Sequence, residues 1–455
     1  MKGKNAVSLR WIKGICACSV ILPFCYVWSL YYNDLAFSKW WIQGAAASAI
    51  LYSTIYLMLA RLYEAFHIET CQIGEMIFSQ TLAFGIADGI LYLECCLIRG
   101  SVVNILPGFL AAGLQFLFAS VFVFYGKQHL LHHVKPYRTL LISRAVRRSE
   151  ADLFKERLAT KLYYLFDIED VYYCKPQQQS FPLAQIEAFE AVLMYEVPAN
   201  LRSRIFAYCV EQQKILYVTP RLDDIFLFGF ENSHVLDTPL MRYGVSAQGR
   251  REGYLSKRFW DIVISLLMLV FFSPFMLLTA AAIKLEDHGP IFFKQKRCTL
   301  HGREFDILKF RSMIVDAERI GEVIPCKSGD ARITRTGRII RALRLDELPQ
   351  LFNILKGDMS IVGPRPERIE HVKKYTEAVP EFSARLQVRG GLTGYAQVFG
   401  KYNTTAEDKL KMDLMYIENM SMWMDMKILF LTVKTMFTPE STEGFGEEKR
   451  EGKAK

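Results

Sequence analysis

The sequence predicts a membrane protein of three parts: an α-helical bundle of four membrane spans, a small α/β domain, and a monotopic α/β domain anchored by a re-entrant helical hairpin. Three observations support this fold class. Four apolar runs fill the first 126 residues, strand-like and helix-like segments alternate in the middle of the chain, and another uncharged run opens the last part. The expected domains are 1–134, 135–249 and 250–455.

Each of the four apolar runs has close to the ~20 residues that an α-helix needs to cross a bilayer. The runs cover about 12–32, 40–60, 76–98 and 105–125. Lysines and arginines precede the first run and follow the fourth, so the positive-inside rule places both ends of the bundle in the cytoplasm. Asp88 and Glu94 lie in the third run. There they either mark a substrate or proton path, or hydrogen-bond a neighbouring helix, or, for Glu94, lie near the membrane interface.

The second part is predicted to be a Rossmann-like α/β domain. The segments YRTLLISRA, AVLMYEV and KILYVTP are typical of strands, and helical stretches lie between them near 151–166 and 200–212. Strands that alternate with helices predict a parallel sheet. The first strand is followed by SRAVRRSE, which has no glycine, so close approach to a dinucleotide pyrophosphate is not expected. A ligand-sensing module and a packing or dimerisation domain remain open, and a homodimer is compatible with the second.

Charge and cysteine content indicate which partners the protein suits and which covalent or metal sites are unexpected. The chain has a net charge of +9, which suits an anionic partner such as phosphate, nucleic acid or the inner lipid leaflet. Its ten cysteines form no C-x-x-C pair, which favours reduced cytosolic domains without a disulfide framework or zinc site. The charged tail at about 441–455 is expected to be disordered.

The third part opens with an uncharged run of 22 residues, Ile262–Ile283, that contains Ser273-Pro274 at its centre. Proline removes a helical hydrogen bond, so a kink or break is expected there. In lipid the freed carbonyl needs another donor, such as a serine hydroxyl. A kinked fifth span and a hairpin both fit. Basic residues on both sides favour a re-entrant helix at about 259–283, with both ends in the cytoplasm.

Basic side chains follow the hairpin in two groups. The segment KFRSM supplies Lys309 and Arg311 within an aromatic-rich, strand-like stretch. Five arginines then recur at every third position: Arg332, Arg335, Arg338, Arg341 and Arg344. On a helix this spacing drifts around the axis, so only neighbours such as Arg338 and Arg341 can face one site.

Two carboxylates, Asp346 and Glu347, stand beside these arginines in LRLDELPQL. Pro349 is tolerated in a first helical turn, so a helix is expected to begin near Asp346. The positive end of a helix keeps carboxylates ionised and attracts phosphate. The alternative is that Asp346 is only an N-cap.

Two further motifs suit phosphate recognition. In GDMSIVGPRPE, prolines on both sides hold the backbone of Arg365 extended, and a rigidly held guanidinium suits bidentate phosphate binding. The glycine-rich segment VRGGLTGYAQV could let backbone amides approach an anion.

KFRSM, LRLDELPQLFNILKGDMSIVGPRPE and VRGGLTGYAQV resemble, in order, the signature blocks of the bacterial sugar transferases, the monotopic phosphoglycosyl transferases. The resemblance covers about 250–437. The preceding bundle and α/β domain resemble the large subclass by arrangement only. Ser273-Pro274 matches the hairpin break of the family. One departure is VRGG, where many members have proline before the second glycine.

The resemblance implies that a hexose 1-phosphate, glucose or galactose being favoured, moves from a UDP-sugar to undecaprenyl phosphate with release of UMP. Asp346 would be the nucleophile, through an aspartyl phosphosugar, and Glu347 its partner in Mg²⁺ binding. Arg341 and Arg365 would bind substrate phosphate, and Lys309 and Arg311 are assigned to the same role. The expected place is the cytoplasmic face of the bacterial inner membrane, at the first membrane step of exopolysaccharide, capsule or O-antigen synthesis.

Two other functions compete with this one. A non-catalytic membrane scaffold of polysaccharide assembly would use Asp346 only as a helix cap. A nucleic-acid-binding membrane regulator would use the basic charge. The chain has no recognition-helix or aromatic-platform motif, so no nucleic-acid partner is expected.

Overall fold

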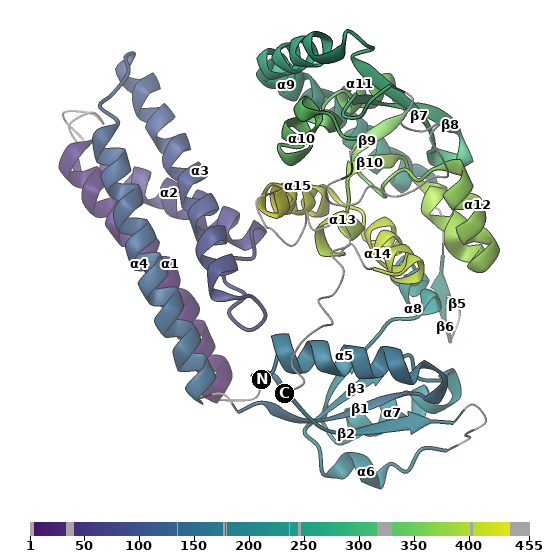
Figure 1. The fold of residues 1–455 in the computed structure, drawn as a ribbon. Helices are drawn as coiled ribbons and strands as arrows, with labels where there is room; N and C mark the ends of the chain where they lie inside the picture. Colours follow the sequence, from purple (N-terminus) through teal and green to yellow (C-terminus); the bar gives the residue numbers. More distant parts are fainter. Residues whose placement is uncertain are drawn as a thin grey trace, which may run out of the picture. The chain divides into compact units, whose positions relative to one another are not determined.

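The computed structural model describes residues 4–32, 41–133, 135–175, 178, 180–235, 237–243, 247–315, 330, 332–400 and 404–436. The chain divides into two compact units, residues 1–220 and 221–455, which are described in turn (Figure 1). The expected disordered tail at 441–455 lies outside the described residues.

Four helices occupy the four apolar runs of the first unit. They are α1 (Lys4–Tyr31), α2 (Trp41–Leu62), α3 (Ile73–Arg99) and α4 (Leu106–His133). Three of them, α1, α3 and α4, are long and apolar enough to cross a membrane, and α2 has a shorter apolar stretch, Ala46–Leu62. Four apolar helices thus occur in the predicted order, and three of the four predicted spans are confirmed as long and apolar enough to cross a membrane.

A polar contact inside this bundle bears on Asp88. The Nε2 atom of Gln115 lies 2.5 Å from the hydroxyl of Tyr52 and 3.4 Å from Oδ1 of Asp88. The Asp88 carboxylate is thus a hydrogen-bond partner of a neighbouring helix, as the simpler of its two interpretations requires.

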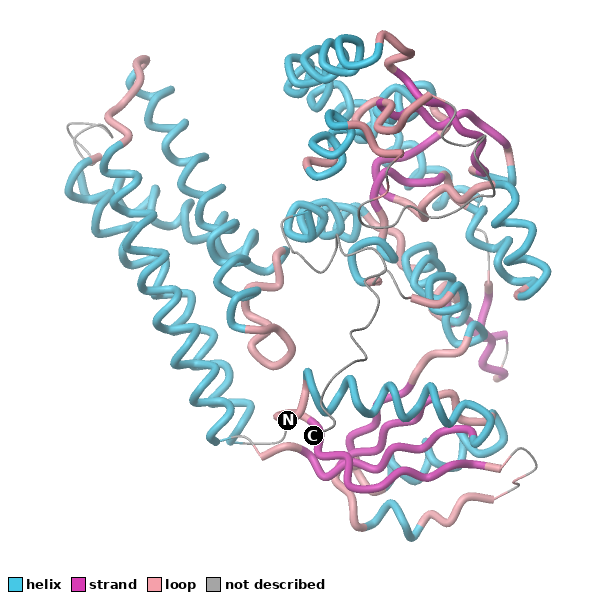
Figure 2. Tube along the Cα trace, viewed as in Figure 1, coloured by secondary structure: helices cyan, strands magenta, loops and turns pink. Residues whose placement is uncertain are grey.

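The α/β domain of the first unit is a four-stranded parallel sheet, as predicted (Figure 2). Its elements are β1 (Tyr137–Arg144), η2 (Ala145–Arg147), α5 (Arg148–Lys161), β2 (Phe166–Cys174), α6 (Ala184–Glu187), β3 (Ala191–Tyr195), α7 (Ala199–Glu211) and β4 (Ile215–Val218). The spatial order is β2-β1-β3-β4. Strand β2 was not predicted, because its sequence FDIEDVYYC carries three acidic residues and only its two ends are buried.

The second unit is a mixed α/β domain. It begins with α8 (Leu222–Leu227), β5 (Glu231–Val235), β6 (Thr238–Arg242) and α9 (Ala247–Asp287), followed by the antiparallel pair β7 (Phe292–Cys298) and β8 (Glu304–Phe310) with η3 (Leu300–Gly302) between them. Next come α10 (Arg335–Ala342), η4 (Leu345–Glu347), α11 (Gln350–Lys356), β9 (Met359–Val362), α12 (Ile369–Ala378) and η5 (Pro380–Gln387). The described part ends with β10 (Gly390–Thr393), parallel to β9, and with α13 (Tyr395–Phe399), α14 (Ala406–Glu418) and α15 (Met422–Met436).

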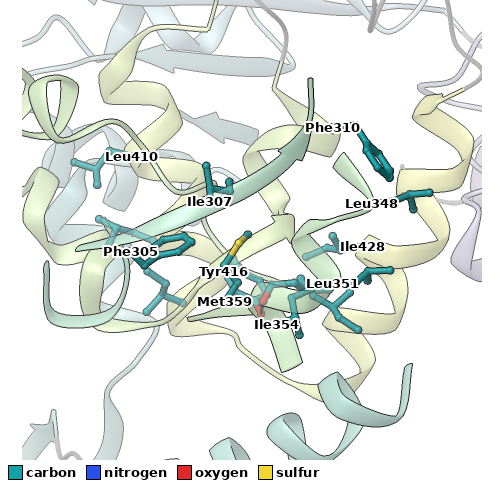
Figure 3. Close-up of a cluster of buried hydrophobic side chains, with 14 of the residues drawn as sticks. Phe305, Ile307, Phe310, Leu348, Leu351, Ile354, Met359, Leu410, Tyr416 and Ile428 are labelled. Carbon is teal, nitrogen blue, oxygen red and sulfur yellow. Dashed lines mark hydrogen bonds between the residues drawn. The ribbon is translucent and has the colours of Figure 1, made fainter. Parts of the chain in front are cut away.

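One hydrophobic core holds the second unit together (Figure 3). It gathers side chains of β8, α11, β9, α14 and α15, among them Ile307, Leu351, Met359 and Ile428. Ile225 of α8 also belongs to this core, so residues 222–227 pack in this unit although the predicted boundary lies at 249. The ends of β8 and η4 that carry charged side chains are therefore packed against this core.

Helix α9 carries the predicted membrane anchor. It continues as one helix through Ser273 and Pro274, so the expected break at this pair is absent, and a kink there stays a prediction. The Ser273 hydroxyl donates to the carbonyl of Val270, 2.8 Å away, which is the carbonyl that Pro274 leaves without a donor. The expectation that a serine hydroxyl replaces the missing N–H is confirmed.

The two faces of α9 differ in burial. Met276 and Ile283 belong to the core, while other apolar side chains point outward. The exposed ones are Leu255, Phe259, Trp260, Leu266, Leu267, Val270, Phe271, Phe275, Leu277, Leu278 and Leu285. Helix α9 is thus packed on the domain along one side and unusually apolar on the other.

Candidate active site

The two carboxylates lie in a 3₁₀ turn between α10 and α11. Helix α10 ends at Ala342, and Arg344 then adopts a left-handed backbone with φ of +56°, which reverses the chain before Leu345–Glu347. The expected helix begins at Gln350, later than predicted, and its N-cap is Pro349. Asp346 is therefore not the cap of this helix, and its side chain is buried instead.

Glu347 is held by two cations from distant parts of the chain. Its Oε1 atom accepts hydrogen bonds from Nζ of Lys309 and from Nη2 of Arg365, each at 2.7 Å. Burial alone would raise the pKa of Glu347, but the two cations outweigh burial and lower this pKa well below its usual range. Glu347 is thus ionised and fixed in one orientation.

Asp346 is in the opposite situation. Among the described residues, its carboxylate has no hydrogen-bond or ion-pair partner. Burial raises the pKa of Asp346, the neighbouring Glu347 charge adds to the increase, and Lys309, Arg341 and Arg344 act against it. A buried carboxylate that keeps its lone pairs uncommitted, with cations nearby, is suited to attack a phosphorus atom.

The arginines of the repeat divide into separate roles. Arg341 and Arg344 contribute to the electrostatic surroundings of Asp346. Arg332 instead pairs with Asp330 at 2.7 Å, and its contact holds the chain before α10. That Arg338 and Arg341 face one site stays a prediction.

Arg311 lies elsewhere. It is buried and forms an ion pair with Asp287 at the end of α9. Its Nε and Nη1 atoms are also buried and have no partner among the described residues. The structure therefore brings Lys309, Arg341 and Arg365 to the carboxylate pair, while Arg311 joins the domain to its membrane helix.

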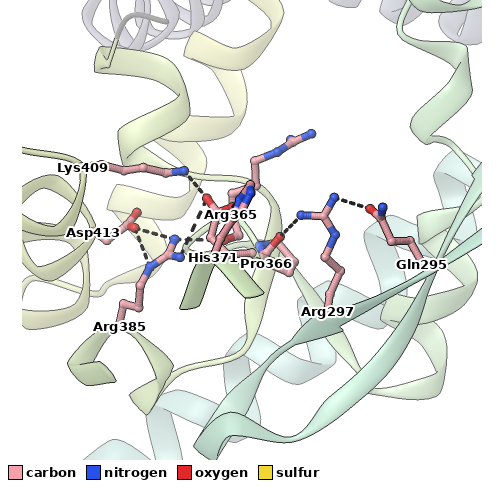
Figure 4. A network of polar contacts seen from close by, with 9 residues as sticks. Gln295, Arg297, Arg365, Pro366, His371, Arg385, Lys409 and Asp413 are labelled. Atoms are coloured by element: carbon pink, nitrogen blue, oxygen red, sulfur yellow. Dashed lines mark hydrogen bonds and ion pairs between the residues drawn. The ribbon is translucent and has the colours of Figure 1, made fainter. Parts of the chain in front are cut away.

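A second ionic cluster, which the sequence analysis missed, surrounds the turn that carries Arg365 (Figure 4). Arg385 of η5 pairs with Asp413 of α14 at 2.7 Å, and Glu367 pairs with Lys409. Glu367 follows the proline motif directly and could have been noticed. Arg385 and Asp413 are 28 residues apart and carry no local motif.

The glycines of VRGGLTG serve packing. A Cβ atom on Gly391 would lie 2.1 Å from the backbone nitrogen of Gly363, and one on Gly390 would lie 2.7 Å from the ring of Pro366. Only glycine lets β10 approach the proline turn this closely. These residues therefore shape the turn behind Arg365.

The carboxylate pair can hold a magnesium ion only if water and substrate phosphate supply the other ligands. In the described part of the chain, no group of three or more His, Cys, Asp or Glu side chains could hold a metal. Mg²⁺ at phosphate sites often uses one or two carboxylates and takes its other ligands from water and phosphate. Both bonds to Glu347 end on Oε1, so Oε2 of Glu347 is available for this role.

The fold and the site define a membrane-anchored α/β protein with a carboxylate–cation centre of the kind that handles phosphate groups. Residues 252–439 match the family model described as "Bacterial sugar transferase". The chain belongs to the bacterial sugar transferase family.

Named relatives agree with this assignment. The chain is 45% identical over 192 residues to the UDP-glucose:undecaprenyl-phosphate glucose-1-phosphate transferase of Caulobacter vibrioides, which is 41% of this chain and 72% of that protein. It is 45% identical over 193 residues to the UDP-N-acetylgalactosamine-undecaprenyl-phosphate N-acetylgalactosaminephosphotransferase of Aeromonas hydrophila, which is 42% of this chain and 44% of that protein. It is 40% identical to an uncharacterized sugar transferase, EpsL, of Bacillus subtilis over 41% of this chain and 90% of that protein. The match thus spans less than half of the Aeromonas relative.

Proposed function

We propose that this protein transfers a hexose 1-phosphate from a UDP-sugar to undecaprenyl phosphate and releases UMP. The names of the Caulobacter and Aeromonas relatives support this reaction and both substrate classes. The observation that carries the proposal is the contrast within the carboxylate pair. Glu347 is neutralised by two cations at 2.7 Å, while Asp346 is buried beside it and has no such partner among the described residues.

The reaction would proceed in two displacements. In the first, an Asp346 oxygen attacks the phosphorus that bears the sugar, the bond from this phosphorus to the bridging oxygen breaks, and UMP leaves with that oxygen. In the second, a phosphate oxygen of undecaprenyl phosphate attacks the same phosphorus, and the Asp346 carboxylate leaves. The product is undecaprenyl-diphosphate-sugar. A soluble donor and a lipid acceptor then never need to bind at the same time.

Positioning and charge would do most of the catalytic work, because phosphoryl transfer spreads negative charge over the phosphate oxygens. Lys309, Arg341 and Arg365 lie where they can balance this charge. Glu347 sets the direction of Lys309 and Arg365 through its Oε1 atom. A Mg²⁺ ion held by Oε2 of Glu347 and by the substrate would neutralise the diphosphate and the departing UMP.

Contacts at both ends of α9 support the proposed membrane arrangement. Near its start, Lys257 pairs with Asp425 at 2.5 Å. Near its end, Glu286 accepts hydrogen bonds from the first amides of α10, and Asp287 pairs with Arg311. Both ends are therefore tied to one domain, which supports a re-entrant, monotopic anchor over a fifth span. The basic flanks and the need for UDP-sugar support the cytoplasmic face of the inner membrane.

Asp346→Asn tests the proposal. It keeps the side-chain volume and removes the nucleophilic charge. UMP release from UDP-glucose, UDP-galactose and UDP-N-acetylgalactosamine would be measured with undecaprenyl phosphate in membranes of the full chain. We expect loss of turnover and of the labelled adduct that the native protein forms with donor alone.

Asp358→Asn is the matched control. Asp358 is also buried in the second unit, but it pairs with Arg303 at 2.8 Å and is not part of the carboxylate pair. The control should keep its turnover. Full activity of Asp346→Asn would refute the mechanism. A native protein that releases no UMP from any donor would instead favour the scaffold.

A further inference from the structure

The turn Pro364–Glu367, which presents Arg365, cannot hold itself in place. Pro364 and Pro366 have no N–H, so the turn lacks two of its backbone donors. Its conformation must then depend on groups outside the turn that bind its carbonyls and its side chains. Figure 4 shows such groups on both sides.

On one side the turn is held by Arg297 of β7. Its Nη1 atom donates to the carbonyl of Pro366 at 3.1 Å, and its Nη2 atom donates to Oε1 of Gln295 at 2.5 Å. Burial lowers the pKa of Arg297 to about 10, and the charge of Arg365 contributes to the decrease. The Pro366 carbonyl is thus bound by a buried guanidinium that lies near a second cation, Arg365.

On the other side the turn is held by Arg385. Its Nη2 atom donates to the carbonyl of Arg365 at 2.9 Å and to Oδ2 of Asp413 at 2.7 Å. Arg385 and Asp413 each have side chains only 2% exposed, so this is a closed ion pair that solvent cannot rearrange.

The end of the turn is fixed as well. The Glu367 side chain pairs with Lys409 and lies 4.0 Å from Nη1 of Arg385. The Glu367 carbonyl accepts from the amide of Cys298 at 3.1 Å. Three successive carbonyls, those of Arg365, Pro366 and Glu367, are thus each bound by a donor from outside the turn.

We propose that Arg297 and Arg385 are positioning residues that act through Arg365. They donate hydrogen bonds to two successive carbonyls of its turn, those of Arg365 and Pro366, and so orient its guanidinium toward Glu347 and the substrate phosphate. Neither touches the carboxylate pair in the structure. The proposal rests on the transferase reaction proposed above. A displacement of about 1 Å in a positioning group can reduce a rate by about 100-fold, so the effect on catalysis should be large.

The test is a double-mutant cycle with Arg385→Lys and Arg297→Lys, each in the native and in the Arg365→Ala background. A lysine keeps the charge, but a single ammonium cannot reproduce the planar fork that reaches two acceptors. Single-turnover UMP release and the Kd for UDP, by calorimetry, are measured for all variants. Arg303→Lys is the matched control, because Arg303 pairs with Asp358, which lies outside the turn.

We expect each lysine variant to lower the single-turnover rate of UMP release by about 10- to 100-fold and to weaken UDP binding when Arg365 is present. In the Arg365→Ala background the same changes should alter UDP binding by less than about 3-fold, because the group that they position is gone. Equal losses in both backgrounds would overturn the proposal and leave a purely structural role. If one variant fails to fold, the other decides. Absence of UMP release by the native protein would instead contradict the proposed function, and the UDP-binding cycle would still test the positioning.

Discussion

The hydroxyl of Ser273 provides a sharp test of the membrane helix. Pro274 has no N–H to offer the carbonyl of Val270, and the Ser273 hydroxyl donates to that carbonyl at 2.8 Å instead. Ser273→Ala removes this donor. The Val270 carbonyl then lies on the apolar outer side of α9 without a partner. Pro274→Ala supplies a backbone N–H that can take over.

The magnitude follows from the cost of an unmade hydrogen bond. A buried carbonyl without a donor costs about 1–3 kcal/mol, and the upper part of this range applies where no water can reach it. For a domain of this size, a loss of about 2 kcal/mol lowers the Tm by roughly 4–8 °C. In the Pro274→Ala background the same Ser273→Ala change should cost only about a few tenths of a kcal/mol, so the two substitutions should be strongly non-additive.

Thermal unfolding of the four variants in lipid nanodiscs of one composition measures this coupling. Ser265→Ala is the matched control, because Ser265 lies on the same helix and its buried hydroxyl has no partner among the described residues. This control should not lower the Tm. If Ser273→Ala destabilises the protein equally with and without Pro274, the hydroxyl does not replace the missing amide.

Three further changes probe the second unit. Glu367→Gln should destabilise the protein by about 3 kcal/mol at pH 7, because burial raises the Glu367 pKa but Lys409 and Arg385 outweigh burial and lower this pKa from 4.5 to about 2. This loss of stability should shrink as the pH falls from 4.5 towards 2, and Tm measurements against pH would show the change. Gly337→Ala should lower the Tm markedly, because the new Cβ would lie 2.1 Å from the backbone oxygen of Ser312 and the start of α10 would have to move. Leu351→Ala should cost about 2–5 kcal/mol in denaturant unfolding because this side chain is fully buried in the core, and a loss below about 1 kcal/mol would contradict that packing.

Much of the fold is predictable because its signals are local. Runs of about 20 apolar residues identify membrane helices by composition alone. The parallel sheet of the first unit follows from β-branched segments that alternate with helical ones, and only β2 escapes this pattern. The prolines beside Arg365 and the adjacent carboxylates Asp346 and Glu347 are recognisable as motifs in the amino-acid sequence itself.

By itself, the sequence determined the membrane anchoring, the order of the parts and the identity of the carboxylate pair, because periodicity, length and neighbouring residue types are properties of short segments. Tertiary structure alone decided which of the two carboxylates is paired with cations. Lys309 meets Glu347 across 38 positions of the chain, and Arg385 meets the Arg365 carbonyl across 20. Such pairings depend on how β8, α11 and η5 pack on a common core, and no local pattern encodes that packing.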